Sequence, residues 1–210
     1  MTRLLVTSQR ENYIPNRDEK WDCLDQKLSE FFLIAGAWLL LPAPNTLMGK
    51  TGGTNHQPAP LSSWLERINP SGIILSGGGD PRSQTKRYET ENYLIKYALT
   101  KRIPLLGICR GMLAIGAYFG ANIVDVKNHV GAKHRLIGQI NQSVNSYHNL
   151  ALSEVPDQFD IVALSERDKT LEAMRHLEFP IYAQMWHPER EKKFHKGDLE
   201  RLDLFFKGKK

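Results

Sequence analysis

The 210-residue sequence has no long hydrophobic run, only two cysteines and no leader pattern at its N-terminus. Its longest apolar stretch, Phe31–Leu41, falls well short of the roughly 18 residues that a membrane-spanning helix requires. Met1–Thr7 lacks the long apolar region and the small-residue cleavage site of a signal peptide. From these absences we expect neither an integral membrane protein nor a secreted one, but a cytoplasmic protein that does not act at a membrane.

The scarcity of cysteine and the pattern of basic residues narrow the remaining classes. Cys23 and Cys109 allow at most one disulfide, and in a cytoplasmic protein both are expected to be free thiols. The formal net charge of +5 suits an anionic substrate, but it equally suits an ordinary solvated basic surface. The basic clusters at 192–193 and 207–210 are not interleaved with aromatic residues, so nucleic acid is not an expected partner.

The order of apolar segments predicts the fold class. The length suits one domain over residues 1–210, and there is no repeat, linker or low-complexity tract. Hydrophobic periodicity predicts strands at Arg3–Thr7, Trp38–Leu41, Ile73–Leu75, Ile103–Ile108, Ile161–Leu164, Leu171–Met174 and Ile181–Met185. It predicts helices at Trp21–Ala37, Arg87–Thr100, Arg110–Phe119 and Gly197–Lys207, and a long loop at Pro42–Pro60. Such alternation is typical of an α/β protein with a mainly parallel sheet covered by helices on both faces.

The segment around Cys109 carries the strongest chemical signal. A buried strand runs directly into Gly107-Ile108-Cys109-Arg110-Gly111, which is followed by a helix. Glycines on both sides permit the tight strand-to-helix turn of a nucleophile elbow. The turn exposes the sulfur at a helix N-terminus, where the partial positive charge favours the thiolate. A lone cysteine is often just a small buried hydrophobe, but this context favours a nucleophile.

A thiol nucleophile needs a base, and the base needs an orienting group. The strand that ends at Met185 delivers His187, and Glu189 lies two residues further on, after Pro188. Histidine can take the proton of Cys109 and later give it to a departing amine. A surface histidine beside a surface glutamate is the alternative, and the neighbouring elbow favours a Cys109–His187–Glu189 triad.

The glycine-rich segment Ser76–Asp80 follows another predicted strand. Consecutive glycines allow backbone N–H groups to turn toward a ligand without steric cost. Acyl transfer needs such donors for the developing oxyanion, and one from this loop together with the N–H of Arg110 is a candidate pair. Ordinary turns also use glycine triplets, so the position at a strand end is what makes the segment a candidate.

Three further features are rejected. Gly49-Lys50-Thr51 resembles a phosphate loop but has Pro44 where the first glycine is required. His129 and His134 are five residues apart without a second cysteine or a carboxylate pair beside them, so no metal site is expected. Cys23 falls within a predicted helix and is expected to be structural.

The motifs G-I-C-R-G-M, S-G-G-G-D, N-S-Y-H and W-H-P-E together resemble class I glutamine amidotransferases, and especially their free-standing γ-glutamyl hydrolase relatives. The resemblance spans nearly the whole chain, in the order of the family. It implies a flavodoxin-like doubly wound sheet, no cofactor, and a γ-glutamyl thioester on Cys109 with His187 and Glu189 as activating groups. It further implies oxyanion donors at Gly78 and Arg110.

The same resemblance implies a site for the glutamyl group. It places Gly77 and Gly79 at the substrate, with the backbone of Ser146, Tyr147 and His148 holding the α-amino and α-carboxylate groups. A simple polar loop is the alternative for that second segment.

One position departs from the family pattern. The family usually has glutamine four residues after the cysteine, where this chain has Leu113, which weakens the case for free glutamine as substrate. A smaller branch of the same family is resembled by three further segments: T-S-Q-R, R-D-E-K-W-D-C-L-D and L-L-P-A-P-N. That branch includes enzymes of bacterial capsule and surface assembly that cleave a γ-glutamyl group from a cytidine-diphosphate amide.

Three functions follow as hypotheses. The first is a γ-glutamyl amide hydrolase that releases glutamate and an amine from a small-molecule conjugate. The second is a glutaminase subunit that supplies ammonia to a separate synthase chain. The third is a catalytically silent binding member, which the intact Cys109, His187 and Glu189 disfavour. A homodimer or a synthase partner is the expected assembly.

Overall fold

The computed structural model describes residues 3–48 and 60–208. The rejected phosphate-loop segment 49–51 and most of the predicted loop at Pro42–Pro60 lie outside these residues. Within the described part, no helix is long and apolar enough to cross a membrane.

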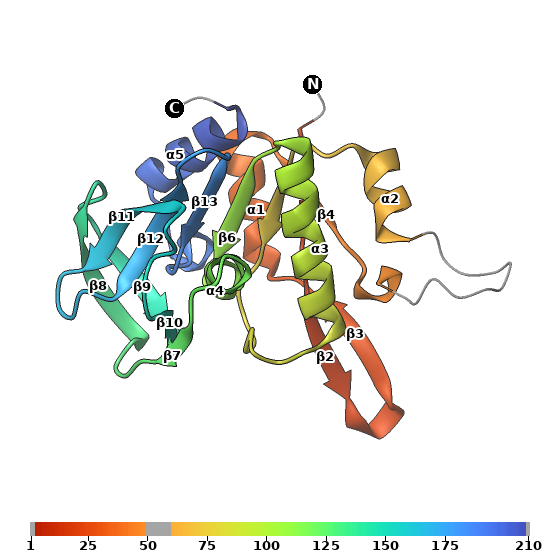
Figure 1. Ribbon diagram of the computed structural model, residues 1–210, viewed down its shortest axis with the longest axis horizontal. Coiled ribbons are helices and arrows are strands. Elements are labelled where there is room, and N and C mark those ends of the chain that lie inside the picture. Colours follow the sequence, from red (N-terminus) through yellow and green to blue (C-terminus); the bar gives the residue numbers. More distant parts are fainter. Residues whose placement is uncertain (1–2, 49–59, 209–210) are drawn as a thin grey trace, which may run out of the picture.

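One large sheet organises the chain (Figure 1). Its nine strands lie in the order β4-β1-β5-β6-β13-β12-β11-β8-β9. The first five pair in parallel, and from β13 onward each pair is antiparallel. In that spatial order the strands are Leu39–Pro42, Leu4–Thr7, Gly72–Leu75, Leu105–Ile108, Ile181–Gln184, Leu171–His176, Phe159–Ser165, Val130–Gly138 and Ser143–Tyr147. The predicted α/β class is therefore confirmed, with an antiparallel extension on its parallel half.

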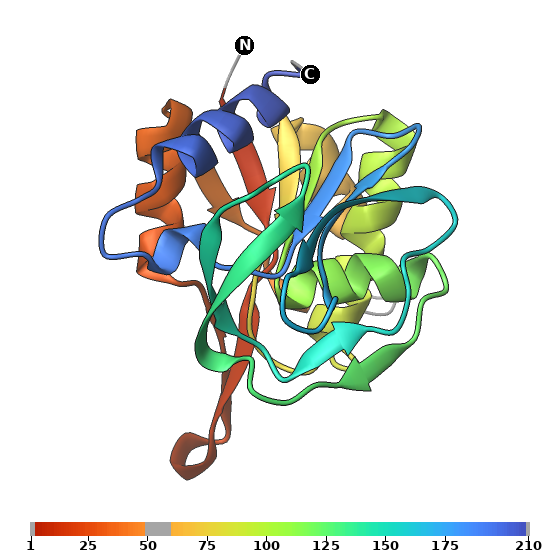
Figure 2. The ribbon, with the colours of Figure 1, turned by 90° about the vertical axis from the view of Figure 1, so that its left-hand side faces the viewer.

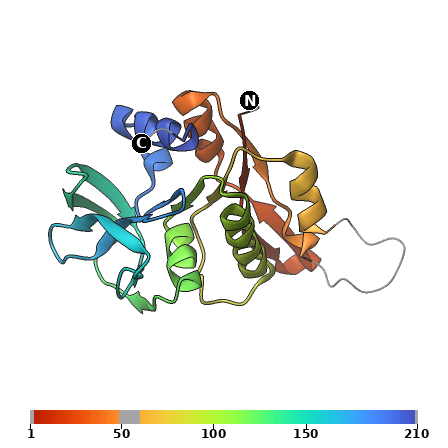
Figure 3. The same cartoon turned by 45° about the horizontal axis from the view of Figure 1, so that its top comes forward.

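Helices cover both faces of the parallel half (Figures 1 and 3). On one face, α1 (Gln26–Gly36) and α5 (Lys196–Phe206) pack together through a core that includes Phe31, Phe32 and Leu202. On the other lie α2 (Leu61–Ile68), α3 (Lys86–Lys101) and α4 (Arg110–Tyr118). The central strands β5, β6 and β13 are buried at every position, which explains their continuous apolar sequence.

The predicted helix Trp21–Ala37 is wrong in its first part. Residues Glu19–Cys23 form β3, which pairs with β2 (Arg10–Ile14) in a hairpin that projects from the body (Figure 2). The side chain of Asp25 accepts a hydrogen bond from the N–H of Lys27 and so caps α1 at its true start. Trp21 matched the helical spacing by chance, and Cys23 ends a strand instead of lying on a helix.

The segment after α4, which has no regular pattern in the sequence, forms short strands. β7 (Ile123–Asp125) and β10 (Leu150–Leu152) form a two-stranded sheet beside the main one. Three short 3-10 helices complete the described chain: η1 (Pro15–Arg17), η2 (Asn45–Leu47) and η3 (Pro188–Arg190). Neither α2 nor the β2–β3 hairpin was predicted from the sequence.

The packing of α4 on β5 leaves no room for a side chain at Gly111. A Cβ there would collide with the backbone carbonyl oxygen of Leu75. We expect Gly111→Ala to lower the free energy of unfolding by about 1–3 kcal/mol, because backbone cannot move aside as a side chain can. Gly197→Ala in α5 is the control, since nothing lies within 4 Å of its Cβ position. Equal urea denaturation midpoints for the two variants would contradict this packing.

Candidate functional site

Cys109 lies at the turn between β6 and α4, at the carboxyl edge of the parallel strands. Its backbone has φ 51° and ψ −106°, a conformation that costs a non-glycine residue about 1–3 kcal/mol. Its N–H donates to the carbonyl of Gln184 at 2.8 Å, so pairing with β13 continues to the cysteine itself. A Cβ at Gly107 would be 2.8 Å from the backbone of Gly111, so both glycines are required for this turn. The predicted elbow geometry is present.

His187 follows β13, the strand that pairs in parallel with β6. The two strands therefore end at the same edge, which brings His187 to Cys109. The Nδ1 atom of His187 is 2.6 Å from Oε1 of Glu189, which lies in η3, and both side chains are almost completely buried. On its other side the ring of His187 lies against Gly77, where a Cβ would collide with it. The three predicted triad residues are thus brought together.

Electrostatics at this site favour a thiolate–imidazolium pair. Burial raises the pKa of Cys109, but a hydrogen bond and the charge of His187, the nearby His148 and the N–H of Arg110 outweigh it and lower the pKa. Burial lowers the pKa of His187, whereas Glu189 and Cys109 raise it, with a net increase to about 9. A thiolate at neutral pH is the reactive form of cysteine.

Asn145 holds the backbone of His187, a role that was not predicted. Its Oδ1 accepts from the N–H of His187 at 2.9 Å, and its Nδ2 donates to the carbonyl of His187 at 2.7 Å. Nδ2 also donates to Oε1 of Glu191 at 2.8 Å. The side chain of Asn145 thus joins β9 to the turn that carries His187 and fixes the direction of the imidazole.

Arg87, from α3, fixes the glycine loop that follows β5. Its guanidinium donates to the carbonyl oxygens of Ser76 and Gly78 at 2.7 Å each, and more weakly to that of Gly77 at 3.4 Å. In a planar trans peptide the N–H points opposite to the carbonyl. The N–H groups of Gly78 and Gly79 therefore point away from Arg87, as donors for a bound oxyanion must.

Glu91 ties this loop to the elbow helix. Its carboxylate accepts from Arg87 at 2.7 Å and from Arg110 at 2.9 Å, and all three side chains are at least 96% buried. It also accepts from the hydroxyl of Ser8 at 3.1 Å. Neither Arg87 nor Glu91 was predicted as a site residue, although both share the buried helix face of Leu94, where charged side chains are unexpected.

The predicted glutamyl-binding residues divide into two groups. Gly77 lies against His187, and the Cβ position of Gly79 is 3.6 Å from the guanidinium of Arg110. Ser146 is buried with its hydroxyl donating to the carbonyl of His129 at 2.5 Å, so only its backbone remains for a ligand.

The two residues after Ser146 lie closer to the reactive groups. The ring centroid of Tyr147 is 6.1 Å from that of His187. The guanidinium carbon of Arg190 lies over the Tyr147 ring, 5.2 Å from its centroid. His148 is buried near Cys109. Leu113, by contrast, is buried in the core.

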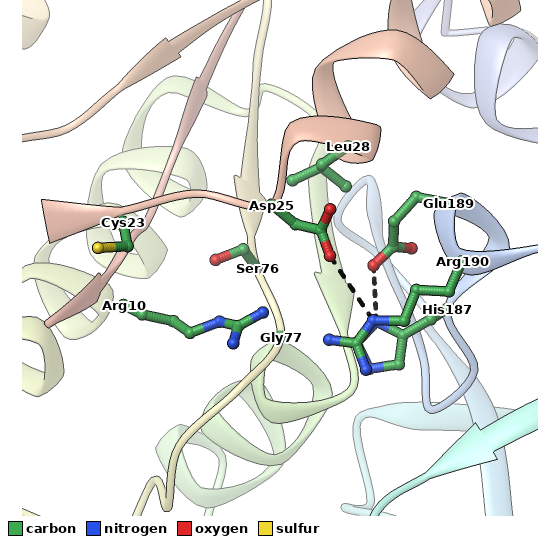
Figure 4. A pocket seen from close by; sticks show the side chains of 9 residues that line it. All are labelled: Arg10, Cys23, Asp25, Leu28, Ser76, Gly77, His187, Glu189 and Arg190. Atoms are coloured by element: carbon green, nitrogen blue, oxygen red, sulfur yellow. Dashed lines mark hydrogen bonds and ion pairs between the residues drawn. The ribbon is translucent and has the colours of Figure 1, made fainter. Parts of the chain in front are cut away.

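A small pocket opens beside His187 (Figure 4). Arg10, on β2, points from the hairpin toward Gly77 and packs over Gly78, whose Cβ would be 2.5 Å from the guanidinium Nε. Arg190 and Asp25 pair across the opposite wall at 3.7 Å. Cys23, expected to be structural, also lines this pocket. Arg10 was not predicted as a site residue, and only its place in the T-S-Q-R segment pointed to it.

Comparison with known proteins shows which family the chain belongs to. The family model described as glutamine amidotransferase class-I matches residues 54–206. The chain belongs to the class I glutamine amidotransferase family.

Members of this family share both sequence and fold with the chain. A γ-glutamyl-CDP-amidate hydrolase of Campylobacter jejuni subsp. jejuni serotype O:2 is 36% identical over 149 residues, which are 65% of this chain and 73% of the relative. Component 2 of anthranilate synthase from Saccharolobus solfataricus is 35% identical over 138 residues, 60% of this chain and 70% of the relative. The crystal structure of a glutamine amidotransferase from Thermotoga maritima has a TM-score of 0.62 and 14% identity, over 99% of this chain and 94% of that one. The predicted family and amidotransferase fold are confirmed.

Replacing Glu189 with glutamine tests the charge relation between His187 and Cys109. Because Glu189 raises the pKa of His187, we expect Glu189→Gln to lower it and so to weaken the imidazolium that stabilises the thiolate. The pKa of Cys109 then rises, and the midpoint of its alkylation by iodoacetamide moves to higher pH by about one pH unit. Glu191→Gln is the control, because Glu191 contacts Asn145 and not the imidazole. Identical alkylation profiles for the two variants would disprove this coupling.

Proposed function

We propose that this amidotransferase-family chain hydrolyses a γ-glutamyl amide bond with Cys109 as nucleophile, His187 as proton carrier and Glu189 as its orienting group. The observation that carries the proposal is the buried contact between His187 and Glu189 at 2.6 Å, next to a cysteine whose pKa is lowered. A purely structural cysteine has no need of a strained backbone or a charged neighbour.

The reaction proceeds in two steps. The thiolate of Cys109 attacks the γ-carbonyl carbon, and the N–H groups of Gly78 and Arg110 stabilise the oxyanion. The C–N bond breaks as the imidazolium of His187 gives its proton to the leaving nitrogen. Water, deprotonated by the now neutral His187, attacks the resulting thioester. Glutamate leaves and the proton remains on His187, which restores the thiolate pair.

The glutamyl group binds on the edge formed by the glycine loop and the turn after β9. Gly77 and Gly79 border the reacting carbonyl, and the backbone of Ser146, Tyr147 and His148 receives the α-amino and α-carboxylate groups. The network of Arg87 and Glu91 keeps the loop in place before substrate arrives, so little ordering remains to be done upon binding.

The leaving group is a nucleotide-linked amide, as in bacterial capsule or surface polysaccharide assembly. Two observations support this choice: the relative named as a γ-glutamyl-CDP-amidate hydrolase, and the position of Arg10. The guanidinium of Arg10 makes no ion pair within residues 3–48 and 60–208, yet it lies over Gly78 beside the proposed oxyanion hole. A phosphate attached to the departing nitrogen would supply the missing negative charge.

A glutaminase subunit that feeds ammonia to a separate synthase is the second candidate. It is favoured by relatives such as component 2 of anthranilate synthase, whose name marks it as one part of an assembly. The two candidates separate by whether hydrolysis needs another chain.

The main test is glutamate release from a panel of γ-glutamyl compounds that includes glutamine, polyamine and nucleotide-linked amides. We expect the purified chain alone to hydrolyse a nucleotide-linked member fastest. Cys109→Ala should be inactive because it removes the sulfur that hydrogen-bonds to His187. Activity of Cys109→Ala at the wild-type rate would rule out the mechanism. Glutaminase activity that appears only after a synthase chain is added would favour the second candidate.

Arg10→Gln tests the nature of the leaving group. Hydrogen bonds to charged groups contribute about 1.5–3 kcal/mol, so we expect kcat/KM for the nucleotide-linked amide to fall roughly 10–100-fold. Hydrolysis of a neutral γ-glutamyl amide should change little. Arg17→Gln, on the exposed end of the same hairpin, is the control and should leave both rates unchanged. An equal loss of kcat/KM on both substrates in Arg10→Gln would show that Arg10 does not bind a phosphate of the leaving group.

A further inference from the structure

A second group of ionisable side chains lies inside the antiparallel half of the molecule, which Figure 2 brings to the front. His129 directly precedes β8 and His134 lies within it, His148 follows β9, and Glu172 lies in β12. Their exposed fractions are 1%, 4%, 3% and 0%. Charged and imidazole groups are rarely buried together in this way without a reason.

The four side chains point at a common centre. One nitrogen or oxygen atom from each lies within 4.8 Å of the corresponding atom of every other. Oε1 of Glu172 is 3.5 Å from Nε2 of His148 and 3.8 Å from Nδ1 of His129. These separations are long for hydrogen bonds. They are near the roughly 3.3–3.5 Å that separates ligands held about 2.0–2.2 Å from a tetrahedral ion.

Within the described part of the chain, the atoms that face this centre have no hydrogen-bond partner. Among the described residues, no hydrogen bond is made by Nδ1 of His129, Nε2 of His134, Nε2 of His148 or either oxygen of Glu172. A buried carboxylate without any partner costs several kcal/mol, since it has lost its water. A positive charge at the centre of the four side chains would compensate the buried carboxylate.

The hydrogen bonds of His129 and His148 outside the group show which ring nitrogen of each carries the hydrogen and which presents a lone pair to Glu172. Nε2 of His129 is 2.8 Å from the carboxylate of Asp168, and Nδ1 of His148 is 2.9 Å from the carbonyl oxygen of Leu150. Both partners can only accept, so these nitrogens carry the hydrogens. In the neutral rings the opposite nitrogens are then bare lone pairs directed at Glu172. Histidine ligands of metals are typically oriented by such outer contacts.

We propose that His129, His134, His148 and Glu172 bind one divalent transition-metal ion of the zinc class. Three imidazoles and one carboxylate suit Zn²⁺ and its neighbours better than Mg²⁺ or Ca²⁺, which prefer oxygen ligands. Four protein ligands and deep burial leave no open position for substrate, so the ion is structural. It joins β8 and β12 to the end of β9, where Tyr147 and His148 lie near the reactive groups.

The sequence alone argued against this site, because His129 and His134 have no suitable neighbours along the chain. The fold supplies the two missing ligands from separate strands: His148 after β9 and Glu172 in β12. The proposal does not depend on the reaction assigned to Cys109.

The experiment measures Zn²⁺ binding by the full chain carrying Cys109→Ala, so that the reactive thiol cannot contribute a ligand. After chelation and dialysis, Zn²⁺ is titrated in competition with a chromophoric chelator, and Co²⁺ replaces it for spectroscopy. We expect one equivalent per chain, the visible absorption of tetrahedral Co²⁺, and a melting temperature raised by about 5–10 °C at a hundredfold excess over Kd.

Variants locate the bound ion. His134→Gln and Glu172→Gln should each lose more affinity than the roughly 10–100-fold expected for Asp168→Asn, which removes only an outer contact. His195→Gln, at an exposed histidine, is the control and should bind normally. Glu172→Gln keeps the shape of the side chain. If His134→Gln fails to fold, the Zn²⁺ affinity of Glu172→Gln therefore tests the site. No binding by the parent chain, or unchanged binding in Glu172→Gln, would overturn the proposal.

Discussion

The turn at Cys109 is the constraint on which the rest of the structure depends. A central strand of the sheet must change into a helix within one residue, which requires a strained backbone at the cysteine and close packing at Gly107 and Gly111. The turn holds the sulfur at the carboxyl edge of the sheet and at the first turn of α4. Because β13 pairs with β6 in parallel, the same constraint determines where His187 emerges.

Buried polar groups then maintain the edge that this turn creates. Glu91 holds Arg87 and Arg110, and Arg87 holds the carbonyls of the glycine loop. On the opposite side, Asn145 holds the backbone of His187 from β9. Breaking one member of such a pair leaves a buried charge without compensation, so these contacts specify one arrangement of the site more than they add stability. The proposed metal ion would serve the same purpose for the strand pair behind β9.

The elements whose roles follow from local sequence were predictable, and those that depend on distant contacts were not. Gly107–Gly111 and His187–Glu189 carry their geometry in adjacent residues, and continuous apolar runs marked the buried strands. The end of β3 was mistaken for the start of a helix because Trp21 happens to fit a helical period. Arg10 and Glu172 gain their roles only from residues far away in the chain, where no local spacing indicates what they face. The grouping of His129, His134, His148 and Glu172 was missed for the same reason.

The central claim is that Cys109 carries the glutamyl group during the reaction. It is tested most directly by mixing the chain with excess γ-glutamyl substrate, quenching in acid within the first turnovers, and measuring the mass of the intact protein and its peptides. We predict a mass increase of one glutamyl group, located on the peptide that contains Cys109, removed by hydroxylamine and absent from Cys109→Ala. Turnover of the substrate with no glutamyl adduct, or an adduct on another residue, would contradict the account.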